Sequence, residues 1–182
     1  MKIPILITTR LSLRPLDKKD ISKLFQILQE PGILRYFPNP SPPSLEKARN
    51  IIQEQLTQYE KFGLGEWGVE ETGTGELLGW CGINHLSETN EFEIAYLLKE
   101  SARGQGFAIE AARTSLQYGF KSLGIHQIIA LVHPYNTVSQ RVINKLGMKF
   151  LEKKTYWGME CLKFHTIREW ATDLPPIKIL RR

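Results

Sequence analysis

The sequence predicts an α/β protein of the α+β type, with a mixed, mostly antiparallel sheet of about seven strands flanked by helices. Three observations support this prediction. Segments rich in strand-forming residues near 66–71, 77–85 and 91–99 follow one another across short turns, as antiparallel neighbours do. The run Ile128–Val132 is apolar throughout, which indicates a strand buried on both faces of a sheet. Around these strands, apolar residues recur at helical spacing.

The first third of the chain is expected to form one strand and two helices. Leu11–Arg14 alternates as a strand should, and Asp17 is a good N-cap for a helix that runs to about Gln29. Pro31-Gly32 stops this helix, and after a proline-rich loop Ser44 caps a second one. The residues that the two helices turn inward are Ile21, Leu24, Phe25, Leu28, Ala48, Ile51, Ile52, Leu56 and Tyr59.

The rest of the chain alternates strands and helices. A glycine turn at 103–108 opens a helix, and Asn136 caps a second, shorter helix that Gly147 closes. Two more strands are expected near 149–156 and 160–166, and the proline-broken tail is either loose or docked on the sheet or on a partner. The helix that the glycine turn opens has a narrow face of small and apolar residues that is expected to point inward. These residues are Ala111, Ala112, Ser115, Leu116, Gly119 and Phe120.

Composition limits the class of protein. A chain of 182 residues suits one domain, expected at residues 1–173 and followed by a C-terminal tail at 174–182. No apolar run approaches the ~20 residues that span a membrane, and the first ten residues lack the apolar region of a signal peptide. We therefore expect a cytoplasmic protein with no membrane partner. Cys81 and Cys161 are too few for a disulfide framework or a zinc site, so both are interpreted as reduced thiols and no metal is expected.

The net charge of +5 suits an anionic cofactor, but it does not form the dense basic stripe of a protein that binds nucleic acid directly. The stretch Arg103-Gly104-Gln105-Gly106-Phe107-Ala108 provides a place for such a cofactor. A glycine turn at a helix N-terminus leaves backbone N–H groups free at the positive end of the helix dipole, and such a place binds phosphate. The dinucleotide fingerprint fails at Ile109, and no Gly-Lys-Ser/Thr run for a nucleoside triphosphate exists.

The pattern of Arg103, Gly106 and Ala108 resembles the acetyl-CoA pyrophosphate loop of the GNAT acetyltransferase superfamily. The run from Asn136 through Ser139 to Leu146-Gly147-Met148 is similar to the branch that contains the ribosomal-protein N-terminal (RimJ/RimL-like) acetyltransferases. Segments 9–14 and 76–80 fit the same branch, so the resemblance extends from about Thr9 to Phe164. It implies the GNAT fold, with two central parallel strands that splay apart.

The resemblance implies direct transfer of an acetyl group from acetyl-CoA to a primary amine, without an acyl-enzyme. It places the pyrophosphate on the amides of 103–108 and the pantetheine arm along Ala95, Tyr96 and Leu97, and it gives Asn136 a hydrogen bond to the pantetheine amide. A backbone N–H near Ala95–Leu97 would then face the thioester oxygen, as in an oxyanion hole. Acetyl-CoA is the expected cosubstrate.

The attacking amine must be neutral, so a general base is needed. Glu93 is the first candidate, because it lies on the strand that reaches the cofactor, where an acid is common in the family. The alternative is that Glu93 is a solvated or salt-bridged strand glutamate. Glu91 is a weaker candidate in the turn, and His133 at the end of the second buried strand is more readily explained as a strand-end histidine.

The departing thiolate must receive a proton. Many family members carry a tyrosine seven residues beyond the capping asparagine, but here that position is Ile143. The resemblance therefore suggests Ser139 as the proton donor and as a cofactor contact, with Tyr135 as the other donor within reach. An ordinary first-turn polar residue is the alternative for Ser139. No Cys-His-Asp/Asn constellation surrounds Cys81, which is expected to be a small buried residue.

The acceptor site is expected in the loop between the first two helices, at Arg35, Tyr36 and Phe37, whereas Trp67 and Trp80 are expected in the core. The expected acceptor is a protein or peptide N-terminal amine. A small amine, such as an amino acid, a polyamine or an antibiotic, is the alternative. A non-catalytic module that binds acetyl-CoA stays open as a third possibility, because fold does not guarantee activity. The chain is expected to be a monomer or a homodimer.

Overall fold

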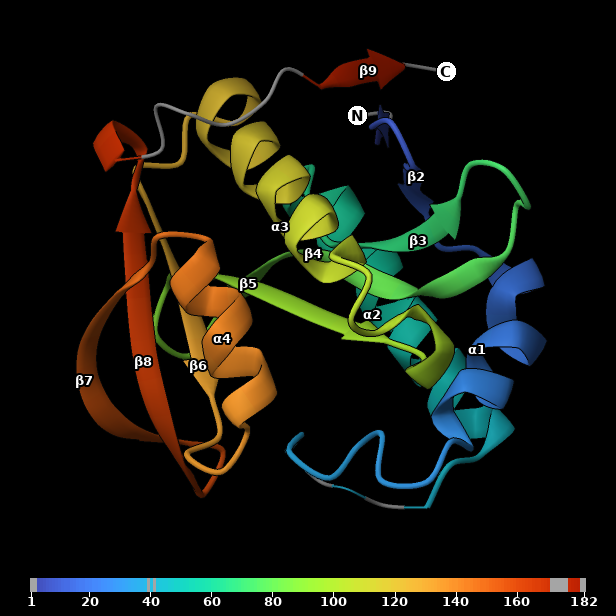
Figure 1. Cartoon of the computed structure of the whole chain (residues 1–182), viewed down its shortest axis with the longest axis horizontal. Helices are drawn as coiled ribbons and strands as arrows, with labels where there is room; N and C mark the ends of the chain where they lie inside the picture. Colours follow the sequence, from blue (N-terminus) through green and yellow to red (C-terminus); the bar gives the residue numbers. More distant parts are fainter. Residues whose placement is uncertain (1–2, 39, 41, 171–176, 181–182) are drawn as a thin grey trace.

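A computed structural model describes residues 3–38, 40, 42–170 and 177–180. Its described strands form one sheet in the order β7-β8-β6-β5-β4-β3-β2-β1-β9. Only the β5–β6 pair is parallel among them, which confirms the mixed, mostly antiparallel sheet (Figure 1). The strands are β1 (Ile5–Ile7), β2 (Leu11–Pro15), β3 (Glu66–Glu71), β4 (Leu77–Leu86), β5 (Glu91–Leu98), β6 (Gln127–Val132), β7 (Lys149–Tyr156), β8 (Met159–Ile167) and β9 (Lys178–Leu180).

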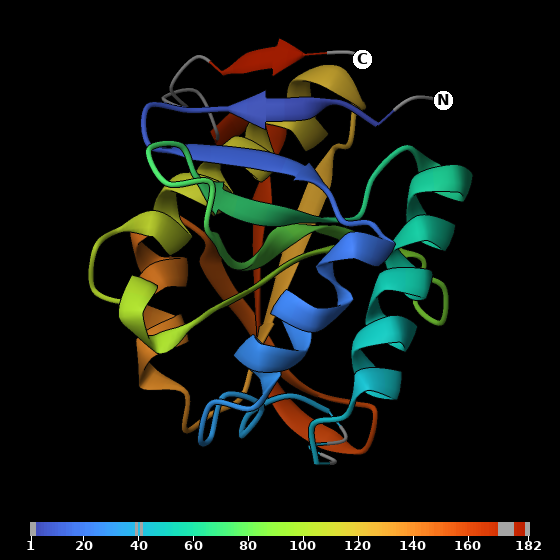
Figure 2. The ribbon, with the colours of Figure 1, turned by 90° about the vertical axis from the view of Figure 1, so that its right-hand side faces the viewer.

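Helices cover both faces of this sheet. The helices α1 (Ile21–Leu28) and α2 (Leu45–Phe62) lie together on one face. The helices α3 (Phe107–Gln117) and α4 (Thr137–Lys145) lie on the other face, as Figure 2 shows. The expected flanking arrangement is therefore present, and the fold class predicted from the sequence is confirmed.

Two short strands add to the seven expected ones. Leu6 of β1 lies opposite Leu13 of β2, and β9 pairs antiparallel with β1 on its other side. Part of the predicted tail is therefore docked on the sheet, while residues 174–176 and 181–182 of that tail lie outside the described residues. The division of the chain at residue 173 stays a prediction.

The helix ends follow their capping residues. The side chains of Ser44 and Asn136 cap α2 and α4 as expected. Asp17 caps a short 3-10 turn, Lys18–Asp20, that precedes α1, so the α-helix proper begins later than predicted. After α3 the chain continues as a π-helical turn, Tyr118–Ser122, which contains the last residues of the expected helix.

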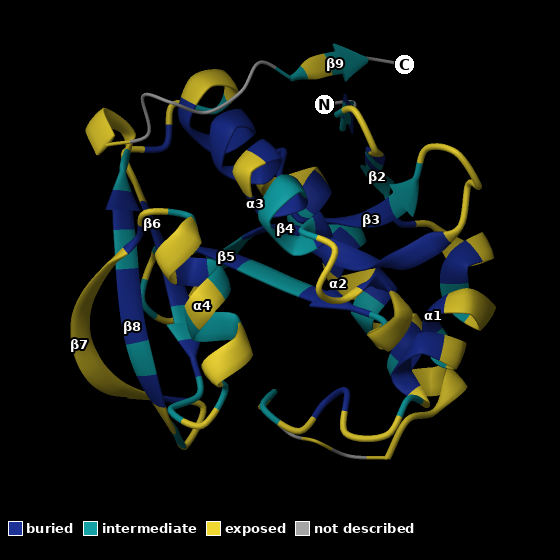
Figure 3. Ribbon diagram, in the orientation of Figure 1, coloured by how far each residue is buried: buried dark blue, intermediate teal, exposed yellow. Residues whose placement is uncertain are grey.

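The core has two parts, one on each face of the sheet. Figure 3 shows that buried residues are concentrated in the central strands and in α3. Trp67 lies in the part beneath α3, and Trp80 lies in the part beneath α1 and α2; both indoles are buried, as expected. Cys81 and Cys161 are free and buried thiols. Among the described residues, no helix combines the length and the apolar character that crossing a membrane needs.

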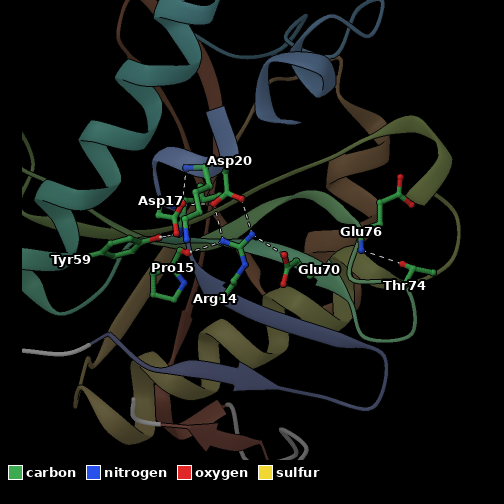
Figure 4. Close-up of polar contacts among 10 residues, drawn as sticks. Arg14, Pro15, Asp17, Asp20, Tyr59, Glu70, Thr74 and Glu76 are labelled. Atoms are coloured by element: carbon green, nitrogen blue, oxygen red, sulfur yellow. Dashed lines mark hydrogen bonds and ion pairs between the residues drawn. The ribbon is translucent and has the colours of Figure 1, made fainter. Parts of the chain in front are cut away.

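A partly buried cluster of ion pairs joins the start of α1 to the sheet. Figure 4 shows Arg14 of β2 between Asp20 and Glu70 of β3. The guanidinium lies 2.7 Å from an oxygen of each carboxylate. Because Asp20 also accepts the Asp17 amide hydrogen, this cluster orders the chain where it leaves the sheet for α1.

Candidate active site

The predicted phosphate loop lies between the end of β5 and the start of α3. Gly104 and Gly106 have φ of 76° and 82°, left-handed values that favour glycine. Within the described residues, no side chain caps the N-terminus of α3. The Arg103 amide is already used, because it donates to the Glu100 carbonyl. The free donors of this loop therefore begin after Arg103.

An arginine far away in the sequence supports this loop. Arg10 donates through Nη1 to the Gln105 carbonyl at 2.9 Å and through Nε to Glu110 at 2.7 Å. Its guanidinium also stacks on the buried Phe107 ring, 4.6 Å from the centroid. These contacts hold the Arg10 guanidinium, in an ion pair with Glu110, beside the uncapped amides. The sequence analysis included Arg10 only in a motif and missed this role.

β5 and β6 separate as the resemblance implies. They share one register pair, Glu93 with Ile129, and run apart from there (Figure 1). Beyond that pair, Ala95 and Tyr96 are partly exposed, whereas Leu97 is buried against the part of the core beneath α1 and α2. The edge of β5 that faces β6 thus has no further described strand partner, and its backbone groups suit an amide-containing ligand.

The N-terminus of α4 faces β5 across this separation. Ser139 and Tyr96 are joined by a hydroxyl–hydroxyl hydrogen bond of 2.8 Å. The Asn136 side chain accepts the Ser139 amide hydrogen at 3.1 Å. Burial raises the pKa of Tyr96 above its usual range. The structure therefore brings two predicted cofactor residues, from β5 and α4, into direct contact.

Glu93 is neither solvated nor salt-bridged, so that alternative is wrong. Its side chain is buried, with 9 % exposed, and no ion pair to it exists among the described residues. Burial and the nearby Glu66 carboxyl raise the pKa of Glu93 to about 8. A backbone hydrogen bond from Leu131 of β6 acts in the opposite direction. In its ionised form, a carboxyl with a pKa this close to that of an amine can take a proton from an ammonium ion.

The weaker base candidates have other partners. Glu91 lies 2.7 Å from Nζ of Lys163 and accepts a hydrogen bond from Tyr156 at 3.0 Å. Although burial acts in the opposite direction, the hydrogen bond from Lys163 keeps the pKa of Glu91 lowered. His133 accepts the Tyr135 amide hydrogen through Nδ1, which fits the strand-end interpretation.

The predicted acceptor loop reaches the end of β6. The Tyr36 ring lies 5.1 Å from that of His133, and the His133 ring lies 5.6 Å from that of Tyr135. Arg35 is exposed and stacks on Tyr36, whereas Phe37 packs edge-on against the buried Trp80. We call Tyr36, His133 and Tyr135 the aromatic rim. It joins the α1–α2 loop to the β6–α4 loop.

A second buried acid was missed in the sequence analysis. Glu66 of β3 accepts hydrogen bonds from Asn84 Nδ2 at 2.9 Å and from Gln55 Nε2 at 3.2 Å. Burial raises the pKa of Glu66 to about 7. The alternation of Trp67 and Val69 into the core indicates that Glu66 faces away from them. The sequence did not indicate that α2 covers that opposite face.

The site contains the groups that acetyl-CoA would need. Uncapped amides and Arg10 can hold a diphosphate, the open edge of β5 can hold an amide-containing arm, and Asn136 lies at the far end. Across the described part of the chain, no group of three or more His, Cys, Asp or Glu side chains is arranged to hold a metal ion.

Comparisons with known proteins agree with this arrangement. Residues 10–149 match the family described as "Acetyltransferase (GNAT) domain". The chain is 34 % identical over 148 residues to the uncharacterised N-acetyltransferase YoaA of Bacillus subtilis, covering 80 % of this chain and 83 % of that protein. It is 28 % identical over 136 residues to the spermidine N(1)-acetyltransferase of Escherichia coli, covering 74 % and 70 %. The structure of the ribosomal L7/L12 α-N-protein acetyltransferase RimL with coenzyme A superimposes with a TM-score of 0.76 at 18 % identity, covering 92 % and 98 % of the chains.

Proposed function

Because this chain belongs to the GNAT acetyltransferase family and is thus an acetyl-CoA-dependent N-acetyltransferase, we propose that it acetylates an N-terminal amine of a peptide or protein, with Glu93 as general base. The observation that supports this proposal best is the buried Glu93 at the point where β5 and β6 separate, which has no ion-pair partner among the described residues. An acid in such surroundings is typical of a catalytic group.

In this proposal, acetyl-CoA binds along one face of the separation. The amides after Arg103, assisted by Arg10, hold the diphosphate of acetyl-CoA. The pantetheine arm lies along Ala95, Tyr96 and Leu97, with Asn136 at its amide. A backbone N–H of this segment then donates to the thioester oxygen and stabilises the oxyanion that forms. Holding both substrates in this geometry itself supplies several kcal/mol of the rate enhancement.

The proton transfers then balance. Glu93 takes one proton from the acceptor ammonium, and the neutral amine attacks the acetyl carbonyl carbon. The carbon–sulfur bond breaks as the tetrahedral intermediate collapses. The nitrogen loses its second proton to solvent, and the thiolate gains one from Ser139, which is reprotonated from solvent through Tyr96. Glu93 later releases its proton to solvent. The net products are the amide, the free thiol and one proton.

Ser139 is the proposed donor to the thiolate, with Tyr96 behind it. Because the two hydroxyls are hydrogen-bonded, Tyr96 can replace the proton that Ser139 gives away. Tyr135 is the weaker alternative, since its side chain is 78 % exposed.

The aromatic rim supports a peptide as the acceptor. It lies at an exposed end of the site, where a chain can pass over Tyr36 and Tyr135 while its terminal amine reaches inward. Arg35 and Phe37 complete the proposed acceptor loop, with Phe37 anchoring it to the core. The cytoplasm is the proposed location of this reaction.

A polyamine is the second candidate acceptor. Glu54 of α2 raises the pKa of Glu66, and Glu66 raises that of Glu93, so three acids influence one another along the acceptor side. The negative potential of these acids favours a molecule with several ammonium groups, without any contact between that molecule and the buried Glu66. The similarity to a spermidine N(1)-acetyltransferase favours the same candidate.

A thiol-release assay with acetyl-CoA separates these acceptors. We expect turnover with peptides that have a free N-terminus and none with the same peptides N-acetylated, with mass spectrometry locating the acetyl group on the terminal nitrogen. Faster turnover with spermidine than with every peptide would replace the first candidate by the second. If calorimetry shows that acetyl-CoA binds but no acceptor causes it to release its thiol, only the non-catalytic alternative is left.

A further inference from the structure

Asn84 lies between the two buried acids. Its register partner across the β4–β5 ladder is Glu93, so the two side chains lie on the same face of the sheet at close range. Its Nδ2 donates to Glu66 at 2.9 Å. Its Oδ1 is buried and has no hydrogen-bond partner within the described residues. A buried acceptor without a donor is unfavourable and needs an explanation.

We propose, on the premise that Glu93 is the general base, that Glu93, Asn84 and Glu66 form a polar relay in which the protonated Glu93 carboxyl donates to Asn84 Oδ1. Asn84 in turn donates through Nδ2 to Glu66. The relay has an unfilled acceptor while Glu93 is ionised and becomes complete when Glu93 gains the proton of the acceptor amine. Asn84 and Glu66 are therefore positioning residues for proton transfer, and neither touches the substrate.

The orientation of the Asn84 amide follows from its neighbours. If Oδ1 instead faced the ionised Glu66, two acceptors would meet in a buried space, and Nδ2 would have to serve Glu93. Glu66 is held in place from the other side, since its own amide hydrogen goes to Gln55 Oε1 at 2.7 Å and Gln55 Nε2 returns a hydrogen bond. A fixed Glu66 thus fixes Asn84, and a polarised amide is a better acceptor for Glu93.

Other charged groups face this network from the elements packed around it. Glu54 of α2 acts on Glu66, and Glu91 of β5 acts on Glu93. The pKa of the Cys161 thiol on β8 is raised mainly by burial and in part by the nearby Glu93 carboxyl. Lys163 of β8 pairs with Glu91, so it does not neutralise Glu93.

The relay can be tested in the full chain without any acceptor. Carboxyl ¹³C resonances of glutamate-labelled protein are followed with pH, and Glu93→Gln and Glu66→Gln identify their own signals. The side-chain NH₂ signal of Asn84 is followed in the same titration. We expect the Asn84 signal to change with both acids in the wild type and with Glu66 alone in Glu93→Gln. An Asn84 signal that ignores Glu93 in the wild type overturns the relay.

Variants give a second, independent test. Asn84→Ala is expected to lower the titration midpoint of Glu93 by about one pH unit, because a net hydrogen bond is of similar size to one unit of pKa. Glu66→Gln, which keeps size and shape, lowers it too by removing a neighbouring negative charge. An unchanged Glu93 midpoint in folded Asn84→Ala contradicts the proposal.

The matched control is Gln58→Ala. Gln58 bridges α2 to β4 in the same way, donating to the His85 carbonyl at 3.0 Å and accepting the His85 amide hydrogen at 3.1 Å. Gln58 touches neither acid, so we expect the titration midpoint of Glu93 to stay unchanged in Gln58→Ala even if the stability of the fold falls. Failure of the base assignment is recognised separately: the relay titrates as expected, but Glu93→Gln turns over at the wild-type rate.

Discussion

Glu93 is a strand glutamate that has, within the described part of the chain, no ion-pair partner of the kind that burial of an acid normally requires. Taking a carboxylate out of water is costly unless a cation or several donors replace the lost hydration. Glu91, two residues earlier, has such a cation in Lys163, whereas Glu93 has none among the described residues. The difference shifts the two pKa values in opposite directions within one strand. This contrast supports a chemical role for Glu93 that Glu91 does not share.

The pH dependence of turnover should reflect this state. Only the ionised carboxylate accepts a proton, so the rate of the wild type is expected to fall as the pH drops below about 8, the pKa of Glu93. Glu93→Gln should lower kcat by about 10²-fold or more, the usual size of general base catalysis, while the Kd for acetyl-CoA stays unchanged. Thiol release measured across the pH range gives kcat, and calorimetry gives the Kd for acetyl-CoA. Glu91→Gln on the same strand is the control, and an equal loss in both variants would contradict the assignment.

The Ser139–Tyr96 pair should behave as one unit. Ser139→Ala and Tyr96→Phe are each expected to slow turnover by about tenfold, which corresponds to roughly one hydrogen bond. The double variant should lose little more than either single variant, because residues in one network do not contribute additively. Steady-state kinetics test this, and Tyr135→Phe should keep the wild-type rate. If Tyr135→Phe is the slow variant instead, the donor is Tyr135.

At the scale of the elements, the regular segments from Leu11 to Thr166 could be predicted because their apolar periodicity and caps agree. β1 and β9 could not be predicted, since three residues contain too little alternation to identify a strand. The phosphate loop was accessible from the sequence because glycine turns have a local pattern. Glu66 and the contact of Arg10 with the loop were not, because both depend on segments that meet only in the folded chain.

Glycine at position 106 should be essential for the α3 N-terminus as a binding element. An added Cβ there would lie 3.5 Å from the Arg10 guanidinium, an ordinary contact, but φ of +82° strains any L side chain. Gly106→Ala is expected to weaken acetyl-CoA binding by about tenfold through ~1–2 kcal/mol of strain in the loop, and Gly106→Trp to abolish it. Calorimetry measures both.

Gly124→Ala is the matched control for this substitution. Gly124 has φ of +69° and nothing within 4 Å of an added Cβ, so it carries the same backbone strain away from the loop. It should lose stability and keep its affinity for acetyl-CoA. If both alanine variants bind acetyl-CoA like the wild type, the assignment of the loop is wrong.

At the scale of the whole molecule, the sheet has two parts that meet at one register pair. β1 to β5 with β9 form one part, and β6 to β8 form the other. Glu93 belongs to the pair that joins them, so the proposed base lies where the separation begins. The same geometry that opens the binding edge of β5 therefore also buries the acid beside it.

Burying two acids should make the stability of the whole fold depend on pH. Glu66 and Glu93 have pKa values of about 7 and about 8 in the folded chain, against about 4.3 for an unfolded glutamate. Between these values the native state binds more protons than the unfolded chain, so the free energy of unfolding falls as the pH rises from about 5 to about 8. In the acid range the trend reverses because of Asp20. Although burial acts in the opposite direction, the hydrogen bonds from Arg14 lower the pKa of Asp20. The stability that this ionised carboxylate contributes is lost as the pH falls through its pKa in the folded chain.

Thermal unfolding of the wild type, Glu66→Gln and Glu93→Gln at pH 5 and pH 8 tests this. Each variant should be more stable than the wild type at pH 8, by about 2–4 °C in Tm for every kcal/mol recovered, and should depend less on pH. Glu91→Gln should gain nothing, because its pKa is lowered and its carboxylate is paired with Lys163. Parallel pH slopes in all four proteins would mean that the two acids are hydrated in solution. The expected combination, in which Glu93→Gln gains stability at pH 8 and loses turnover, would show that the protein keeps a destabilising acid because proton transfer requires it.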